Sequence, residues 1–169
     1  MPTAAAFGVA PNPDADALFA IRDVCTNPEA GYELDYPEVW WTNTEIGEVP
    51  SCSWFSPTFY EVPDPSQRPP EIAIEISLRY DAEGLVVGEA QAEVGRVDGQ
   101  PALRGEIGGS VGDPPDYRAY QYVVLLGPSP GQGPNLVAYT DTTMGGDYAL
   151  NKAVLDRLMA TLQFVGSIQ

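Results

Sequence analysis

The chain has 169 residues, 44% of them hydrophobic and 10% aromatic, a composition that suits one globular domain with a single core. Its 24 acidic and 8 basic residues give a formal net charge of −16, and such a surface repels nucleic acid and anionic membranes. The longest apolar run, Tyr122 to Gly127, falls far short of the roughly 20 residues that span a bilayer, so we expect a soluble protein without a transmembrane segment.

Residues 1–24 are predicted to form an acidic linker or a short helix. The run up to Asp16 is rich in Ala, Pro and Asp, which is typical of the end of a linker. From Asp14 to Val24, large apolar residues lie among acids and alanines, a pattern that suits a short helix with carboxylates in its first turn. Residues 25–169 are expected to form a single α+β domain.

Alternating side chains predict strands in the first half of this domain. Tyr32, Leu34 and Tyr36 alternate with acidic residues until Pro37 ends the pattern. Short aromatic and β-branched segments at 39–44 and 52–55 predict two more strands. Five prolines in residues 57–70 indicate a surface loop, and the clearest strand pattern follows at 72–78.

The second half predicts a hairpin, two further strands and one long helix. Asp98-Gly99 joins strands at 94–97 and 102–107, because this dipeptide supplies the positive φ angles of a tight hairpin turn. Further strands are expected at 117–127 and 136–140.

A C-terminal helix is expected from Asp147, its N-cap, to Gln163. Lys152 and Asp156 are spaced to pair along it. We therefore predict the α+β class, with an antiparallel β-sheet of about six or seven strands flanked by helices, the C-terminal helix covering one face.

Cys25 and Cys52 lack the spacing of a zinc site or a redox pair, and the chain has no histidine to complete a metal-binding set. A disulfide between them, tying the start of the domain to the third strand, is favoured over two buried free thiols. A disulfide would place the protein outside the cell or in the cell envelope.

Two segments, 108–112 and 127–131, match the G-x-S-x-G pattern of serine hydrolases. Their serines, Ser110 and Ser129, have no histidine base anywhere in the chain, and neither segment leads into a helix. We therefore expect no catalytic serine and no cofactor.

Carboxylate pairs offer an alternative, because two carboxyl groups suffice for glycoside hydrolysis. With 24 acidic residues such pairs also arise by chance on a solvated face. A weak divalent-cation site in the loop of Asp113 and Asp116 is a further alternative, and the solubility of the loop is the favoured explanation of these residues. The pairs that lie close in sequence are Glu33 with Asp35, Glu71 with Glu75, and Asp113 with Asp116.

Aromatic residues supply the best candidate for a binding platform. Trp40 and Trp41 are consecutive, so in a strand they point to opposite faces, and Trp41 is expected to be the more exposed because polar residues follow it. Trp41, Asp113 and Asp116 are the predicted ligand-binding residues, for an unknown protein or carbohydrate partner. The aromatic cluster as a whole comprises Tyr36, Trp40, Trp41, Trp54, Phe55, Phe59 and Tyr60.

Three segments resemble the PsbP-like domains of small bacterial envelope proteins. They are G-Y-E-L-D-Y-P-E-V-W at 31–40, V-D-G-Q-P-A-L-R at 97–104, and residues 151–164 with their ending L-x-x-L-M-A-T-L-x-F. The resemblance implies an antiparallel sheet flanked by helices in residues 25–169, on an exported or lipid-anchored protein to which no catalysis is assigned. Metal contacts of photosynthetic members that use histidine cannot be transferred, because this chain has none.

The expected function is therefore that of a non-catalytic envelope or extracellular binding domain. A carboxylate-based hydrolase of a sugar polymer and a structural subunit of a larger assembly are the alternatives. A cleft with two carboxyl groups about 5–9.5 Å apart would favour the hydrolase. A flat apolar patch larger than a few hundred Å² would favour the assembly.

Overall fold

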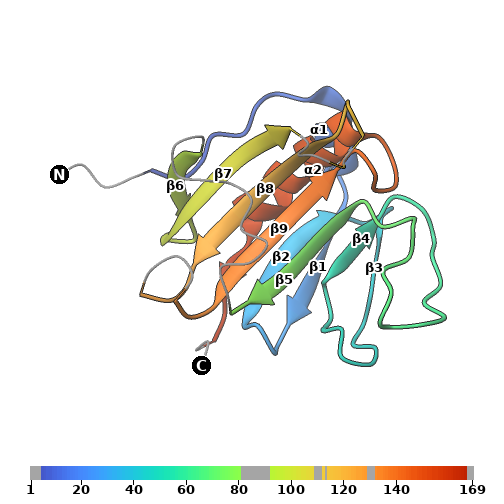
Figure 1. The fold of residues 1–169 in the computed structure, drawn as a ribbon, viewed down its shortest axis with the longest axis horizontal. Coiled ribbons are helices and arrows are strands. Elements are labelled where there is room, and N and C mark those ends of the chain that lie inside the picture. Colours follow the sequence, from blue (N-terminus) through green and yellow to red (C-terminus); the bar gives the residue numbers. More distant parts are fainter. Residues whose placement is uncertain (1–4, 81–91, 109–111, 113, 129–131, 167–169) are drawn as a thin grey trace.

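The computed structural model describes residues 5–80, 92–108, 112, 114–128 and 132–166. These residues form two helices and ten strands (Figure 1). Within them, neither helix has the length and apolar character of a membrane span. In chain order the elements are α1 Pro13–Leu18, β1 Arg22–Asn27, β2 Tyr32–Pro37, β3 Trp41–Thr42, β4 Trp54–Ser56, β5 Ile74–Arg79, β6 Glu93–Val97, β7 Gln100–Gly108, β8 Arg118–Leu125, β9 Asn135–Asp141, α2 Tyr148–Thr161 and β10 Gln163–Phe164.

The strands form two antiparallel sheets. The larger has the order β3-β4-β5-β9-β8-β7-β6, and the smaller has the order β1-β2-β10. The predicted α+β class is confirmed, with a seven-stranded antiparallel sheet. The second sheet was not predicted. The strand expected at 32–36 belongs to this smaller sheet, because β2 pairs with β1 and β10.

Helix α2 lies behind the seven-stranded sheet, on the same side as the small sheet (Figure 1). Asp147 caps it as predicted, since its side chain accepts a hydrogen bond of 3.1 Å from the backbone N–H of Leu150. The helix buries an apolar stripe against strands β2 and β9. Burying each large side chain contributes about 1.5–3 kcal/mol. The fully or almost fully buried members of the stripe are Val154, Leu155, Leu158, Met159 and Leu162.

The pairing predicted within this helix was wrong. Lys152 Nζ contacts Glu106 of β7 at 2.6 Å. Asp156 Oδ1 accepts hydrogen bonds of 2.6 Å from the hydroxyls of both Tyr120 and Tyr122 on β8. An i,i+4 pair on a helix surface contributes only a few tenths of a kcal/mol, so partners on the sheet outcompete it.

The N-terminal residues are divided between two elements. Asn12 caps α1 by accepting a hydrogen bond from the backbone N–H of Ala15, and the helix ends at Leu18. Strand β1 then begins at Arg22, inside the segment 14–24 that was predicted as one helix and across the expected domain boundary at residue 25. Both Ala15 and Phe19 belong to the core that α2 covers.

Local turn chemistry positions the remaining strands. Asp98 and Gly99 adopt φ angles of 46° and 79°, as a tight turn between β6 and β7 requires, and the predicted hairpin is confirmed. Strands β5, β8 and β9 lie where alternation predicted them, whereas the strands expected at 39–44 and 52–55 are reduced to two and three residues.

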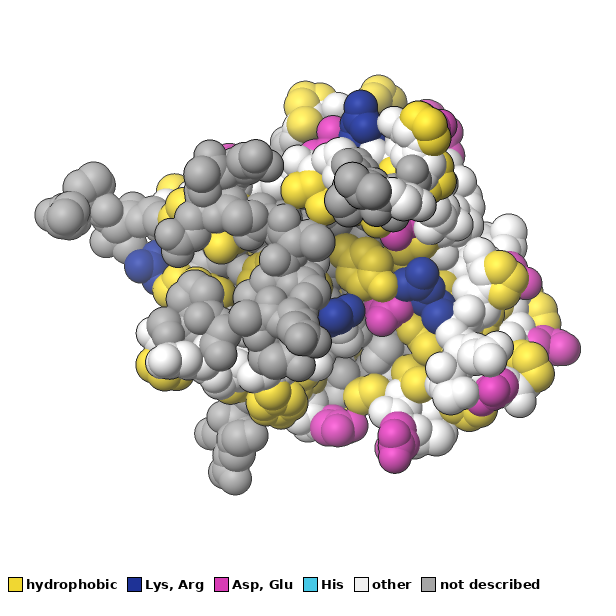
Figure 2. All heavy atoms as spheres, in the orientation of Figure 1, with side chains coloured by type: hydrophobic (Ala, Val, Ile, Leu, Met, Phe, Trp, Pro, Cys, Tyr) yellow, Lys and Arg dark blue, Asp and Glu magenta, His cyan; other side chains and the backbone are white. Residues whose placement is uncertain are grey.

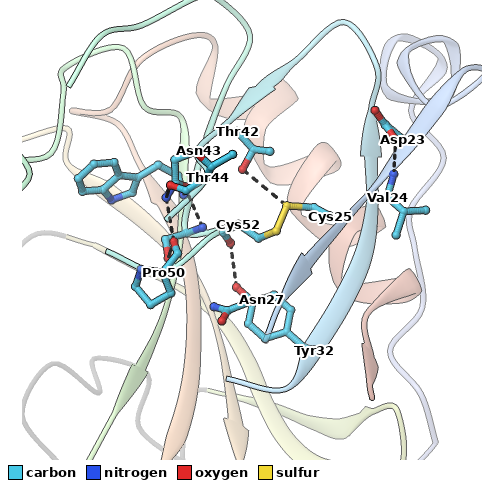
Figure 3. The surroundings of a disulfide bond; sticks show 12 residues. Asp23, Val24, Cys25, Asn27, Tyr32, Thr42, Asn43, Thr44, Pro50 and Cys52 are labelled. Carbon is cyan, nitrogen blue, oxygen red and sulfur yellow. Dashed lines mark hydrogen bonds between the residues drawn. A yellow bond between two sulfur atoms is a disulfide. The ribbon is translucent and has the colours of Figure 1, made fainter. Parts of the chain in front are cut away.

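A disulfide joins the two sheets, as Figure 3 shows. Cys25 lies on β1, and Cys52 lies just before β4, with 5.9 Å between their Cα atoms. Cys52 is outside the strand in which it was expected, with a φ of 65°. The hydroxyl of Tyr32 on β2 donates a hydrogen bond of 2.8 Å to the carbonyl oxygen of Cys52, which adds a second link between the sheets.

Replacing both cysteines by alanine is expected to lower the free energy of unfolding by about 3.5 kcal/mol, because the bond closes a loop with a sequence separation of 27 residues. Urea denaturation followed by tryptophan fluorescence measures the loss. Wild-type protein kept in reductant should show the midpoint of the variant. Equal midpoints for the variant and the oxidised wild type would contradict the assignment.

Candidate ligand-binding site

Residues 59–71, between β4 and β5, surround a pocket of about 580 Å³, which we call the 59–71 pocket. Its walls come from one stretch of chain that the outer face of the seven-stranded sheet holds in place. The hydroxyl of Tyr60 donates a hydrogen bond of 3.1 Å to the carbonyl of Trp54, and both rings belong to a small cluster on that face. The lining residues are Phe59, Tyr60, Glu61, Pro63, Asp64, Gln67, Arg68, Pro69, Pro70 and Glu71.

The shape of the loop follows from its own residues. Its prolines restrict φ and therefore limit the conformations open to the backbone. Asp64 Oδ1 accepts hydrogen bonds from the backbone N–H and the hydroxyl of Ser66, at 2.9 and 2.7 Å, which closes a tight turn. These hydrogen bonds also hold the pKa of the Asp64 carboxyl below its usual value, so the group stays charged in the pocket wall.

Arg68 fastens the loop to the sheet. Its Nη1 donates to Glu75 Oε2 on β5 at 2.8 Å and to the hydroxyl of Tyr139 on β9 at 2.5 Å. Partial burial works to lower the pKa of this guanidinium, but Tyr139 and Glu75 together hold it above its usual value. Burial, and then the charge of Glu75, raise the pKa of Tyr139. The charge of Arg68 is therefore matched by a carboxylate before any ligand arrives.

An exposed aromatic pair lies beside the pocket, and one of its two members lines it. The rings of Trp41 and Phe59 meet edge to face with 5.2 Å between their centroids, and Phe59 also lines the pocket. Trp41 is 48% exposed and Phe59 is 61% exposed. Figure 2 views the outer face of the large sheet, where hydrophobic side chains adjoin basic and acidic ones around a hollow. The two rings together form an aromatic surface that is open to solvent.

The two consecutive tryptophans have opposite environments, as predicted. Trp40 is only 4% exposed and belongs to the core that α2 covers, whereas Trp41 is the exposed member. Strand β3 begins at Trp41, so Trp40 reaches the core from the bend before the strand. The prediction that Trp41 is the more exposed of the two is therefore confirmed.

The structure separates Trp41 from the other predicted ligand residue that it describes. Asp116 is exposed in the loop before β8, and β4, β5 and β9 lie between β8 and the strand of Trp41. Four strand spacings amount to about 19 Å. Asp113, Ser110 and Ser129 lie outside the described residues.

Sequence reasoning placed Phe59 and Tyr60 in an aromatic cluster but did not connect them with Arg68, Glu75 and Tyr139. The connection depends on the pairing of β5 with β9, which sets Glu75 opposite Tyr139. No local pattern specifies that pairing. A signal was nevertheless present, since Arg68 is one of only 8 basic residues and stands in a proline-rich loop.

The carboxylate pairs do not form a free catalytic pair where the structure describes them. Glu75 is held by Arg68, and Asp35 lies 3.5 Å from the guanidinium of Arg22. Among the described residues no group of three His, Cys, Asp or Glu side chains is placed to hold a metal ion.

A second polar cluster lies under the N-terminal segment and has a structural role. Arg104 on β7 contacts Glu93, donates to the carbonyl of Gly8 at 2.7 Å, and stacks over the ring of Phe7. Phe7 in turn occupies the space above Gly95, where a Cβ atom would lie 2.6 Å from its ring. These contacts hold the N-terminal segment on the sheet and leave a recess of only about 100 Å³.

No protein-family model and no curated protein matches this chain. A crystal structure of a protein from Bacteroides thetaiotaomicron VPI-5482 is similar to it, with 14% sequence identity and a TM-score of 0.43. The similarity covers 83% of this chain and 47% of the other, so the chain spans about half the length of that protein.

The two tryptophans provide a matched stability test. Trp40→Ala is expected to lower the free energy of unfolding by about 3–5 kcal/mol, because it empties a core position. Trp41→Ala should cost less than about 1 kcal/mol, since it removes only a solvent-exposed edge contact. Urea denaturation of both variants measures the difference, and an equal loss in the two would show that Trp41 supports the fold instead of a ligand.

Proposed function

We propose that the protein is a non-catalytic binding domain of the cell envelope or the extracellular space, and that its ligand docks at the 59–71 pocket. The observation that carries this proposal is the exposed pair of Trp41 and Phe59, of which Phe59 lines the pocket and Trp41 contacts Phe59. Aromatic side chains are enriched at the centres of binding surfaces, because they offer a large contact area at a low entropic cost.

Two further observations support the cellular location. The disulfide between Cys25 and Cys52 forms and persists in oxidising compartments, which are found outside the cytosol. The resemblance of residues 31–40, 97–104 and 151–164 to PsbP-like domains also favours an exported protein without assigned catalysis.

A second candidate function, that of a subunit in a larger assembly, has an observation of its own. Ile21 and Val39 are each 65% exposed, and with Leu18 and Leu150 they line a largely apolar groove of about 420 Å³. Clustered apolar side chains of this kind mark many protein interfaces. The hydrolase has less support, because Glu75, one of its candidate carboxylates, already pairs with Arg68.

The exposed tryptophan gives a direct test of ligand binding. Trp41 is open to solvent whereas Trp40 and Trp54 are buried, so an aqueous quencher should act mainly on Trp41. We expect a ligand found in a panel of tryptophan-free oligopeptides and oligosaccharides to shield this fluorescence. Trp41→Ala and Phe59→Ala should each weaken binding about 30-fold in calorimetry, the effect of losing one central aromatic contact.

Val94→Ala is the matched control, because Val94 is also exposed but lies on β6, at the opposite edge of the large sheet. It should bind as the wild type does. Ligand affinities that are unchanged in both aromatic variants would contradict the proposed site.

A further inference from the structure

Three of the residues that line the 59–71 pocket are acidic. Glu61, Asp64 and Glu71 all line it, and none of them forms an ion pair with a described residue. Arg68, the basic residue of the lining, is already matched by Glu75. The pocket therefore presents an excess of negative charge to a ligand.

The rest of the pocket suits the apolar part of a cationic side chain. Phe59 and Tyr60 offer aromatic rings, which attract a guanidinium or an ammonium group held over their faces. Pro63, Pro69 and Pro70 add apolar walls on which the methylene stem of arginine or lysine packs while its charged head stays at the carboxylates.

The field of the whole protein acts in the same direction. A formal net charge of −16 concentrates cations near the surface and repels anions. A neutral ligand gains nothing from this field, whereas a basic segment gains in both association rate and affinity. The aromatic and proline walls of the 59–71 pocket, its acidic lining and the net charge of the protein therefore all favour a cationic ligand.

We propose, on the basis of the binding function put forward above, that the 59–71 pocket takes an arginine- or lysine-bearing peptide segment of a partner protein. The charged head of the bound side chain lies at Glu61, Asp64 and Glu71, and its stem packs on Phe59 and Tyr60.

Calorimetric titration with three short tryptophan-free peptides tests this inference. One alternates proline with arginine, and the other two carry glutamine or glutamate in place of arginine. We expect the arginine peptide to bind about tenfold more tightly than the glutamine peptide at about 0.15 M salt, and this advantage to shrink at about 1 M salt. The glutamate peptide should not bind.

Two triple variants separate the pocket from the general field. Glu61→Gln with Asp64→Asn and Glu71→Gln neutralises the pocket, and Asp64→Asn keeps the oxygen that closes the turn with Ser66. Asp23→Asn with Glu29→Gln and Glu38→Gln changes the net charge equally, from −16 to −13, at exposed positions outside the pocket. We expect the pocket variant to lose about tenfold in affinity for the arginine peptide and the control variant to lose less than about twofold.

Each other outcome contradicts the inference in a different way. Equal losses in the two triple variants would assign the binding to the general field of the protein. If the glutamine peptide binds as tightly as the arginine peptide, the ligand is not cationic, and the proposed binding function still stands. The same conclusion follows if a neutral oligosaccharide is the one probe that binds and shields Trp41. Failure of every probe to bind at Trp41 would count against both. If the pocket variant does not fold, the comparison of the three peptides on wild-type protein decides the question.

Discussion

The apolar side of helix α2 is shared between two sheets, and the arrangement of the whole domain depends on this contact. Val154, Leu155 and Leu158 are completely buried, and the helix touches β9 of the large sheet and β2 of the small one. Each such side chain contributes about 1.5–3 kcal/mol, so a few of them match or exceed the disulfide. The disulfide adds a constraint of another kind, because it fixes β1 to the segment that enters β4.

The inner face of the large sheet is occupied by this core, so the candidate site lies on the outer face. Leu103, Val123 and Val137 form a separate small cluster there, and the partly buried side chains of Ala92, Leu125 and Tyr139 pack against it. Glu75 and Tyr139 lie opposite each other on β5 and β9, and Arg68 reaches both. A rigid sheet thus positions a loop whose prolines already limit its conformations, which keeps the pocket open at low entropic cost.

Basic and acidic residues have different roles in this protein. Of the 8 basic residues, 5 form ion pairs with acidic residues that the structure describes, namely Arg22, Arg68, Arg104, Lys152 and Arg157. Such pairs at or near a surface each contribute at most about 1 kcal/mol, so they orient segments more than they stabilise the fold. The 24 acidic residues outnumber the 8 basic ones threefold, so the chain carries a large excess of negative charge. Net charge therefore bears on which ligand binds, and burial decides how the chain folds.

The sequence alone determined the elements whose signals are local. Alternation predicted β2 and β5, the positive φ of Asp98 and Gly99 defined the hairpin, and Asp147 with its apolar stripe defined α2. Which strands pair, and therefore which side chains meet, was decided only by the tertiary structure. It assigned β2 to a separate sheet, gave Lys152 a partner on β7, and set Trp41 beside Phe59 instead of Asp116. Local patterns follow from the backbone of a few residues, whereas strand order and side-chain partners result from competition among distant segments for the same buried surface.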